Sequence, residues 1–220
     1  MEINPIPEST PLHAALQRAR LYGIVDLGYV AVGHAERVIR RMLEGGVQII
    51  QLRAKSVSPA EIAALAKDLA PLCQAAGVPF LLNDHPALVP ETGADGAHVG
   101  QDDLSVAEAR ALAGPGKLIG KSTHSIAQAL AAQKEKPDYI GFGPLFATPT
   151  KPDYPPIGLQ DIVSVHAQVS RPIFCIGGIR RENLPHVLAA GAHRVVIVSG
   201  ILQAADIAEY CRDCLDLLSG

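Results

Sequence analysis

The chain of 220 residues repeats one pattern from end to end, a short apolar run rich in β-branched residues followed by an amphipathic helical stretch. Each segment between two apolar runs is long enough for a helix and too long for a hairpin, which predicts parallel strands joined by helical crossovers. Eight such units, with no linker and no break in composition, favour a closed (β/α)₈ TIM barrel of the α/β class. The expected strands are Leu21–Leu27, Val47–Arg53, Pro79–Asp84, Gly96–Gly100, Lys117–Ser122, Tyr139–Leu145, Pro172–Gly178 and Arg194–Ser199.

A single domain over residues 1–220 is the expectation, with residues 1–19 as an N-terminal extension or helix before the first strand. The main alternative is an open, doubly wound sheet, whose usual mark is a G-x-G-x-x-G turn after the first strand. Here that strand runs into VDLGYVAVG, which does not match. Helix signals fit the barrel pattern, since Ser58-Pro59 with Glu61 opens one helix and Gly114 ends another.

Composition and charge narrow the classes of partner. The chain is 48% hydrophobic, which suffices for a sizeable core, and its net charge of −3 lacks the basic excess of a general nucleic-acid binder. No run approaches the ~18 apolar residues of a membrane span and no leader pattern opens the chain, so we expect a cytoplasmic protein without a nucleic-acid or membrane partner. Cys211 and Cys214 form a C-x-x-C with no second ligand pair, and we expect them to be unliganded on the last helix.

Polar residues gather where the expected strands end. In a (β/α)₈ barrel the catalytic groups cluster at the C-terminal ends of the strands, so these positions carry most of the functional information. They include Asp26, Gln51, Arg53, Lys55, Asn83, Asp84, Gln101, Asp102, Asp103, Ser122 and His124. We therefore expect the functional site at this rim of the barrel.

Two of these carboxylates, Asp84 and Asp103, would face one mouth of the barrel. Like charges so close together are unfavourable unless a cation or proton lies between them. With oxygen ligands and no His/Cys cluster, Mg²⁺ is the natural occupant, and phosphate oxygens usually complete its ligands. The competing interpretation is that each aspartate caps the helix after it. We favour that interpretation for Asp102 and a functional one for Asp84, which follows Asn83.

Three cations are expected on the same rim. Arg53 and Lys55 come from the second unit and Lys151 from the sixth. An arginine offers a planar fork to a phosphate group and a lysine offers a mobile point charge. Each alone would be interpreted as a solvated surface charge, but together with a metal site they describe a pyrophosphate pocket.

A second anion site is expected at the end of the barrel, where loops after strands seven and eight often bind phosphate through backbone N–H groups. These loops read CIGGIRREN and VSGILQAAD, so Gly178 would allow close backbone approach and Ser199-Gly200 leads into a helix. Residues 141–156, GFGPLFATPTKPDYPP, contain five prolines, which predicts a preorganised loop. The two anion sites suit the joining of a diphosphate-bearing molecule to a phosphate-bearing one.

The strings QLRAK, ND, HVGQDDL, GKSTH, GPLFATPTKPD, IGGI and VVIVSGI, in this order and from about Tyr22 to Ile201, resemble thiamine-phosphate synthase. The resemblance implies a (β/α)₈ barrel that requires Mg²⁺. It implies an enzyme that joins a hydroxymethylpyrimidine diphosphate to a hydroxyethylthiazole phosphate, releasing pyrophosphate and forming thiamine monophosphate. It also implies a dissociative substitution in which pyrophosphate leaves before the thiazole nitrogen attacks.

By motif match, the resemblance assigns roles to individual residues. The metal ligands would be Asp84 and Asp103. The pyrimidine diphosphate site would be lined by Gln51, Arg53, Lys55, Asn83, Ser122 and Lys151, and the thiazole phosphate would be held by Thr148, Thr150, Gly178, Val198 and Ser199. The catalytic role would fall to Ser122, Lys151, Arg53 and Lys55. Homo-oligomerisation is left open.

Two positions depart from the family pattern. Ala54 stands where a glutamate is usual, and Gly200 stands where alanine is frequent. A paralogous thiazole tautomerase generally lacks the T-x-T-K pattern that is present here, and in such an enzyme His124 would be a conceivable acid or base. We expect His124 and His98 to be hydrogen-bonded structural histidines. A non-catalytic sensor of phosphorylated ligands on the same scaffold is the remaining alternative.

Overall fold

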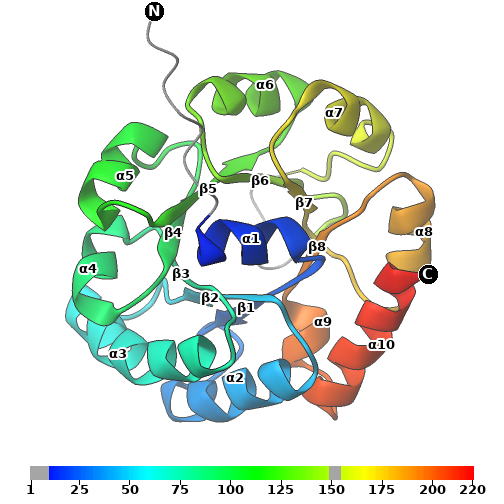
Figure 1. Ribbon diagram of the computed structural model, residues 1–220. Coiled ribbons are helices and arrows are strands. Elements are labelled where there is room, and N and C mark those ends of the chain that lie inside the picture. The colour runs from blue at the N-terminus through cyan, green and yellow to red at the C-terminus, as the bar shows by residue number, and fades with distance from the viewer. Residues whose placement is uncertain (1–9, 149–154) are drawn as a thin grey trace, which may run out of the picture.

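Eight parallel strands close into a barrel in the computed structural model, which describes residues 10–148 and 155–220. The strands lie in chain order from β1 to β8, and β8 pairs with β1 to complete the ring, so the (β/α)₈ prediction is confirmed (Figure 1). The strands are β1 Leu21–Asp26, β2 Ile49–Arg53, β3 Phe80–Asn83, β4 Gly96–Val99, β5 Leu118–Thr123, β6 Tyr139–Phe142, β7 Ile173–Cys175 and β8 Val195–Ile197.

Most strands are shorter than the runs that predict them. Pro79 and Pro172, expected as first strand residues, lie just outside β3 and β7, and neither can donate a backbone N–H to a neighbouring strand. At the other end, the residues after β6 and β7 turn into the loops that form the upper rim. Only β5 extends past its expected end, to Thr123.

Helices cover the barrel, with α1 across its N-terminal end and the others around the outside (Figure 1). They are α1 Pro11–Arg18, α2 Ala35–Glu44, α3 Pro59–Ala75, α4 Val89–Thr92, α5 Val106–Ala113, α6 Ile126–Lys134, α7 Ile162–Gln168, α8 Leu184–Ala189, α9 Ser199–Leu202 and α10 Ile207–Ser219, with short 3-10 turns η1 Val32–His34 and η2 Pro86–Leu88. Ser58 and Glu61 form the expected capping box of α3. The prediction that Asp102 caps its helix is wrong, because the N-cap of α5 lies three residues later, at Ser105, which forms a capping box with Glu108.

The period-two alternation of the strands divides the buried residues into two layers. One layer fills the space between the strands and the outer helices and includes Leu21, Ile50, Phe80 and Ile140. The other fills the barrel itself and comprises Leu16, Ala19, Tyr22, Ile24, Ile49, Leu81, Leu118, Tyr139, Phe174 and Val196. This inner layer ends below the C-terminal ends of the strands, where inward positions become polar.

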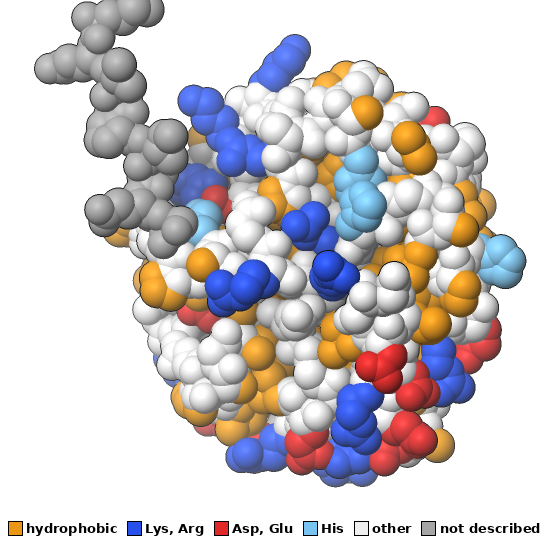
Figure 2. Space-filling model, turned by 45° about the vertical axis from the view of Figure 1, so that its right-hand side comes forward, with side chains coloured by type: hydrophobic (Ala, Val, Ile, Leu, Met, Phe, Trp, Pro, Cys, Tyr) orange, Lys and Arg blue, Asp and Glu red, His pale blue; other side chains and the backbone are white. Residues whose placement is uncertain are grey.

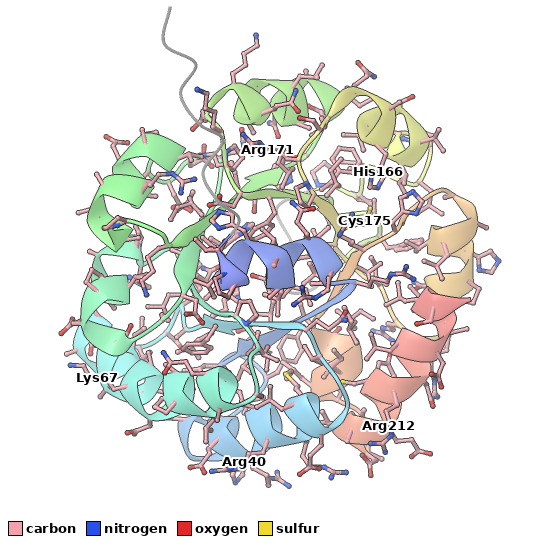
Figure 3. The ribbon with its side chains drawn as sticks, viewed as in Figure 1. Arg40, Lys67, His166, Arg171, Cys175 and Arg212 are labelled. Carbon is pink, nitrogen blue, oxygen red and sulfur yellow. The ribbon has the colours of Figure 1, made fainter. Side chains whose placement is uncertain are left out.

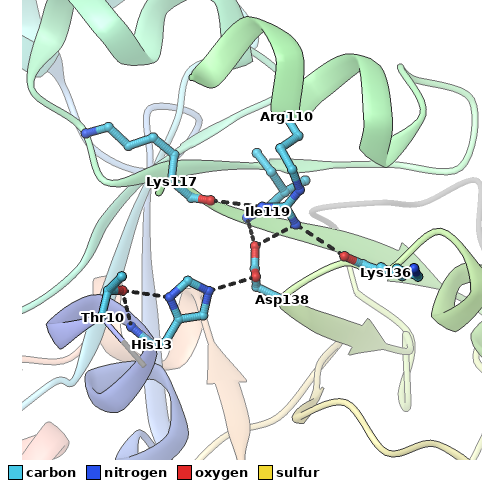
Figure 4. A network of polar contacts seen from close by, with 7 residues as sticks. All are labelled: Thr10, His13, Arg110, Lys117, Ile119, Lys136 and Asp138. Carbon is cyan, nitrogen blue, oxygen red and sulfur yellow. Dashed lines mark hydrogen bonds and ion pairs between the residues drawn. The ribbon is translucent and has the colours of Figure 1, made fainter. Parts of the chain in front are cut away.

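Helix α1 lies across the N-terminal end of the barrel (Figure 1), and its Leu16 packs into the inner layer. A polar network ties this helix to the body of the protein (Figure 4). His13 on α1 contacts the Asp138 carboxylate at 3.0 Å, and the same carboxylate accepts the Ile119 backbone N–H at 2.7 Å and the Arg110 guanidinium at 3.0 Å. Asp138 therefore joins α1, α5 and the start of β5 and β6.

Charged side chains lie mainly on the outer helices. Figure 3 shows Arg40, Lys67 and Arg212 on the periphery, away from the barrel interior, and all three are exposed. Acidic and basic side chains lie side by side along the lower edge of the face in Figure 2. Among the residues placed in the structure, no helix has the length and apolar character needed to cross a membrane.

The Asp138 network gives a stability prediction. Asp138→Ala leaves the buried Ile119 N–H without its acceptor and removes the partner of Arg110, so we expect the free energy of unfolding to fall by about 3 kcal/mol. Urea denaturation followed by circular dichroism measures this. Glu36→Ala, which removes the exposed pair with Arg40, is the matched control and should leave the midpoint unchanged. Equal midpoints for both variants would contradict the assigned role of Asp138.

Candidate active site

A cavity opens within the barrel where the C-terminal ends of the strands meet. Its lining contains eight of the residues expected to bind substrates, namely Gln51, Arg53, Asn83, Ser122, Thr148, Gly178, Val198 and Ser199. They come from β2, β3, β5 and the segments after β6, β7 and β8, so the fold collects residues from position 51 to position 199 into one space. Thr150 and Lys151 lie outside the described residues.

Strand alternation explains why these side chains meet. Gln51 and Arg53 are two residues apart on β2 and share its inward face with Ile49. Ser122 is likewise in step with Leu118 on β5, which belongs to the inner layer. The apolar members lie toward the bottom of the barrel and the polar members lie toward its mouth, so one strand face supplies both the core and the site.

Arg53 is held in place by an acid on the neighbouring strand. Its guanidinium donates to Asp26 Oδ2 at 2.6 Å, and Asp26 Oδ1 accepts the Gly28 backbone N–H at 2.9 Å. The Asp26 side chain is only 3% exposed and that of Arg53 15%, so this pair is well shielded from water. Arg53 also lines the cavity, where the planar fork of a guanidinium suits an anion.

Lys55 and Asp84 form an ion pair at the ends of β2 and β3. Neither is among the residues that line the cavity. Asp84 has a φ of 62°, in the left-handed region that costs energy for most side chains, and it does not cap the following turn. Asp84 therefore does not have the capping role that competes with a functional one.

Asp103 lies in the loop after β4, where its Oδ2 accepts the Gly100 backbone N–H at 2.7 Å. Within residues 10–148 and 155–220, no three His, Cys, Asp or Glu side chains form a group that could hold a metal by themselves. Two carboxylates on neighbouring loops nevertheless suit Mg²⁺, because this ion commonly binds one or two protein carboxylates and takes its other ligands from water and phosphate.

The loop after β6 is fastened to the loop after β7. The backbone N–H groups of Leu145 and Phe146 donate to the carbonyls of Ile176 and Gly177 at 2.8 and 3.0 Å. Gly178 has a φ of 66°, and a Cβ on it would lie 2.6 Å from the Phe146 Cβ. Glycine is therefore required for the close approach, and the first residues of the proline-rich loop are anchored by these backbone hydrogen bonds. Residues 149–154 of that loop lie outside the described residues.

Several contacts of the site are not predicted from the sequence, although it marks Asp26 as a strand-end residue and His98 as a structural histidine. Asp26 orients Arg53, while Tyr22, His98 and Tyr139 line the cavity from below. Their position along the strands was the one sequence signal for them. Each lies two residues from another inward-facing residue of its strand, so strand alternation places it inside the barrel. His124 also lines the cavity, and its Nδ1 lies 2.5 Å from the Gly143 carbonyl oxygen, in agreement with the expected hydrogen-bonded role.

The cysteines lie away from this chemistry. Cys211 and Cys214 are both on α10, as expected, and both are buried. Burial raises the pKa of each thiol to about 12, so both are protonated at neutral pH and neither is a ready nucleophile or metal ligand.

Known proteins share this sequence and fold. The family described as thiamine monophosphate synthase matches residues 21–201. The thiamine-phosphate synthase of Chloroflexus aurantiacus is 41% identical over 202 residues, which cover 91% of this chain and 93% of that protein. That of Synechococcus sp. (strain WH7803) is 43% identical over 93% of this chain, which spans only 58% of that longer protein. The structure of thiamine phosphate pyrophosphorylase from Pyrococcus furiosus has a TM-score of 0.83 and 29% identity, covering 94% of this chain and 98% of that one.

The shielded guanidinium gives a binding prediction. Arg53→Ala removes a charged donor from the cavity, so we expect the affinity for inorganic pyrophosphate to fall by about tenfold or more, as measured by isothermal titration calorimetry. Arg40→Ala removes an exposed arginine on α2 and is the control that should bind as the unaltered protein does. An unchanged affinity in Arg53→Ala would exclude this guanidinium from the anion site.

Proposed function

The chain belongs to the thiamine monophosphate synthase family and has its transferase activity, and we propose how its own residues carry out the reaction. The substrates are 4-amino-2-methyl-5-(diphosphooxymethyl)pyrimidine and 4-methyl-5-(2-phosphooxyethyl)thiazole, and the products are thiamine monophosphate and pyrophosphate. The observation that carries this assignment is a single cavity whose lining combines Gln51, Arg53 and Ser122 on one side with Thr148 and the loops after β7 and β8 on the other.

The pyrimidine diphosphate occupies the side formed by β2, β3 and β5. Gln51 and Asn83 offer amide groups to the edge of the ring, and Ser122 and Arg53 take the diphosphate. Arg53 is supported here by its shielded contact with Asp26, which fixes the direction of the guanidinium fork. Lys55 and Lys151 add positive charge toward the leaving group.

The thiazole phosphate occupies the opposite side. Gly178, Val198 and Ser199 line the cavity from the loops after β7 and β8, and such loops bind phosphate through backbone N–H groups in many barrels of this class. Thr148, and with it Thr150, adds hydroxyl donors from the loop after β6. The contact between the β6 and β7 loops supports this proposal, because it brings Thr148 to the same cavity as Gly178.

The reaction is a dissociative substitution. The bond between the pyrimidine methylene carbon and the diphosphate oxygen breaks first, and its electron pair leaves with pyrophosphate. The aminopyrimidine ring stabilises the resulting cation, and the thiazole nitrogen then donates its lone pair to the methylene carbon. No protein nucleophile is needed, so the residues act by neutralising the charge that develops on pyrophosphate and by aligning the thiazole.

Asp84 and Asp103 are the residues that would hold Mg²⁺. When bound, the ion neutralises charge on the diphosphate and so makes it a better leaving group. The ion pair of Lys55 with Asp84 places a cation beside this carboxylate in the structure described here. The Asp84 carboxylate would thus be neutralised at the rim by either Lys55 or Mg²⁺.

The compartment and assembly are part of the same proposal. Both substrates carry several negative charges and do not cross a lipid bilayer unaided, so we assign the reaction to the cytoplasm. The cavity residues named in this proposal all come from this chain, and the proposal leaves homo-oligomerisation open.

The assay for this function combines the protein with both phosphorylated precursors and Mg²⁺. We expect stoichiometric thiamine monophosphate and pyrophosphate, identified by mass spectrometry and by an enzymatic pyrophosphate assay. Binding of the thiazole phosphate without turnover would instead identify a sensor. Isomerisation of a thiazole carboxylate phosphate without use of the pyrimidine diphosphate would identify a tautomerase.

Asp84→Ala should lower the rate of synthesis by at least about a hundredfold at ordinary Mg²⁺, because Asp103 alone would hold the ion and the diphosphate more weakly. Steady-state kinetics over a range of Mg²⁺ concentrations measures this loss and shows how far excess ion restores it. Asp213 lies on α10 and forms a surface ion pair with Arg181, so Asp213→Ala should retain the full rate. Near-normal turnover in Asp84→Ala would refute the assignment.

A further inference from the structure

A continuous series of hydrogen bonds crosses the inside of the barrel from β2 to β5. Gln51 Nε2 donates to the Tyr22 hydroxyl at 2.5 Å, and this hydroxyl lies 3.0 Å from that of Tyr139. The Tyr139 hydroxyl lies 2.9 Å from His98 Nδ1, and His98 Nε2 lies 2.8 Å from Ser122 Oγ. We call these five residues the barrel relay. Its two ends, Gln51 and Ser122, are both assigned above to the pyrimidine diphosphate.

The middle of the relay is enclosed by packed aromatic rings. Tyr22 and Tyr139 are 1% and 0% exposed, and their rings meet edge to face with centroids 5.9 Å apart. Each also packs edge to face on Phe174 at 5.6 Å. Burial raises the pKa of both phenols well above the ordinary value, so each keeps its proton throughout the neutral range. Each phenol therefore has one proton to donate.

Gly120 on β5 makes room for the relay. A Cβ at this position would lie 2.1 Å from Cζ of Tyr139 and 2.5 Å from His98 Nδ1, which no ordinary contact allows. The backbone of Gly120 does not have a positive φ, so glycine is needed for space and not for conformation. Because Gly120 has no side chain, the Tyr139 hydroxyl can approach the His98 imidazole at this point.

The number of protons makes the relay directional. The amide of Gln51 donates to the Tyr22 hydroxyl, and the acceptor in reach of the Tyr22 proton among the described contacts is the Tyr139 oxygen. We therefore assign the Tyr22 proton to Tyr139, and by the same argument the Tyr139 proton to His98 Nδ1. His98 then carries its proton on Nε2 and donates it to Ser122 Oγ. The Ser122 proton is left for the cavity, and so is the amide oxygen of Gln51. One end of the relay thus donates and the other accepts.

This polarity matches the two ends of one substrate. The carbonyl oxygen of Gln51 suits the amino group of the pyrimidine ring, and the Ser122 hydroxyl suits an oxygen of the diphosphate. Reversing one end of the relay reverses the other, because every group between them has a single proton to share.

We propose that Tyr22, Tyr139 and His98 are positioning residues that couple Gln51 to Ser122, so that the acceptor for the ring and the donor for the diphosphate are set together. The proposal rests on the proposed function for the identity of the ligand. The relay itself is a property of the free protein, which allows the two to be tested separately.

The first experiment measures coupling through binding. Gln51→Ala, Ser122→Ala and the double variant are titrated with the aminopyrimidine diphosphate by calorimetry, without the thiazole, in the unaltered protein and in a Tyr139→Phe background. In the unaltered protein, we expect the loss in the double variant to differ from the product of the single losses by about fivefold or more. The Tyr139→Phe background keeps the ring and removes the middle hydroxyl. There we expect the loss of affinity in the double variant to equal the product of the two single losses.

The second experiment needs no ligand. Nitrogen-15 NMR of the imidazole reports which nitrogen of His98 is protonated, and we expect the Nε2–H tautomer alone in the unaltered protein. Tyr139→Phe removes the donor to Nδ1 and should give a mixture of tautomers. Should that variant fail to fold, Tyr22→Phe interrupts the relay one step earlier and is read by the same binding cycle.

Tyr210→Phe is the matched control, because it removes a buried hydroxyl that accepts the Arg181 backbone N–H on the outer side of the protein. It should leave both the coupling and the His98 tautomer unchanged. Multiplicative losses in the unaltered protein, or coupling that survives Tyr139→Phe, overturn the proposal. If the protein does not bind the pyrimidine diphosphate, the proposed function fails, and an unchanged His98 tautomer in Tyr139→Phe overturns the relay independently.

Discussion

The inward side chains of eight strands have to share one narrow interior, and most features of this protein depend on how they divide it. At the bottom of the barrel the interior is filled by aliphatic and aromatic groups and closed by Leu16 of α1. At the top it is polar and open to ligands. Between the two, tyrosines provide a boundary layer, since their rings pack with the core while their hydroxyls belong to the polar side.

This division also determines how the polar site affects the stability of the folded protein. Polar groups at the boundary cost free energy unless each finds a partner, and the phenols, the imidazole and the Gln51 amide satisfy one another. Arg53 and Asp26 do the same higher in the barrel. The active site is therefore continuous with the core, and a substitution in one changes the other.

The fold and the location of the site follow from the sequence because they depend on local patterns. Strand and helix periodicity, glycines at helix ends and polar residues at strand ends are all visible along the chain. The partnerships inside the barrel are not, because they depend on register between strands. Nothing near Arg53 in sequence indicates Asp26, and nothing near Ser122 indicates His98, which was expected to be an ordinary structural histidine. The capping residue of α5 was also misassigned, since Asp102 and Ser105 are both good caps and only the local turn distinguishes them.

One peptide bond separates a residue that contacts helix α1 from a residue of the relay. Asp138, which receives His13 of α1, directly precedes Tyr139, whose hydroxyl is the midpoint of the relay. The contact that holds α1 across the bottom of the barrel and the floor of the cavity thus meet at the start of β6. A substitution that displaces α1 therefore acts on the strand start that supports the floor of the cavity.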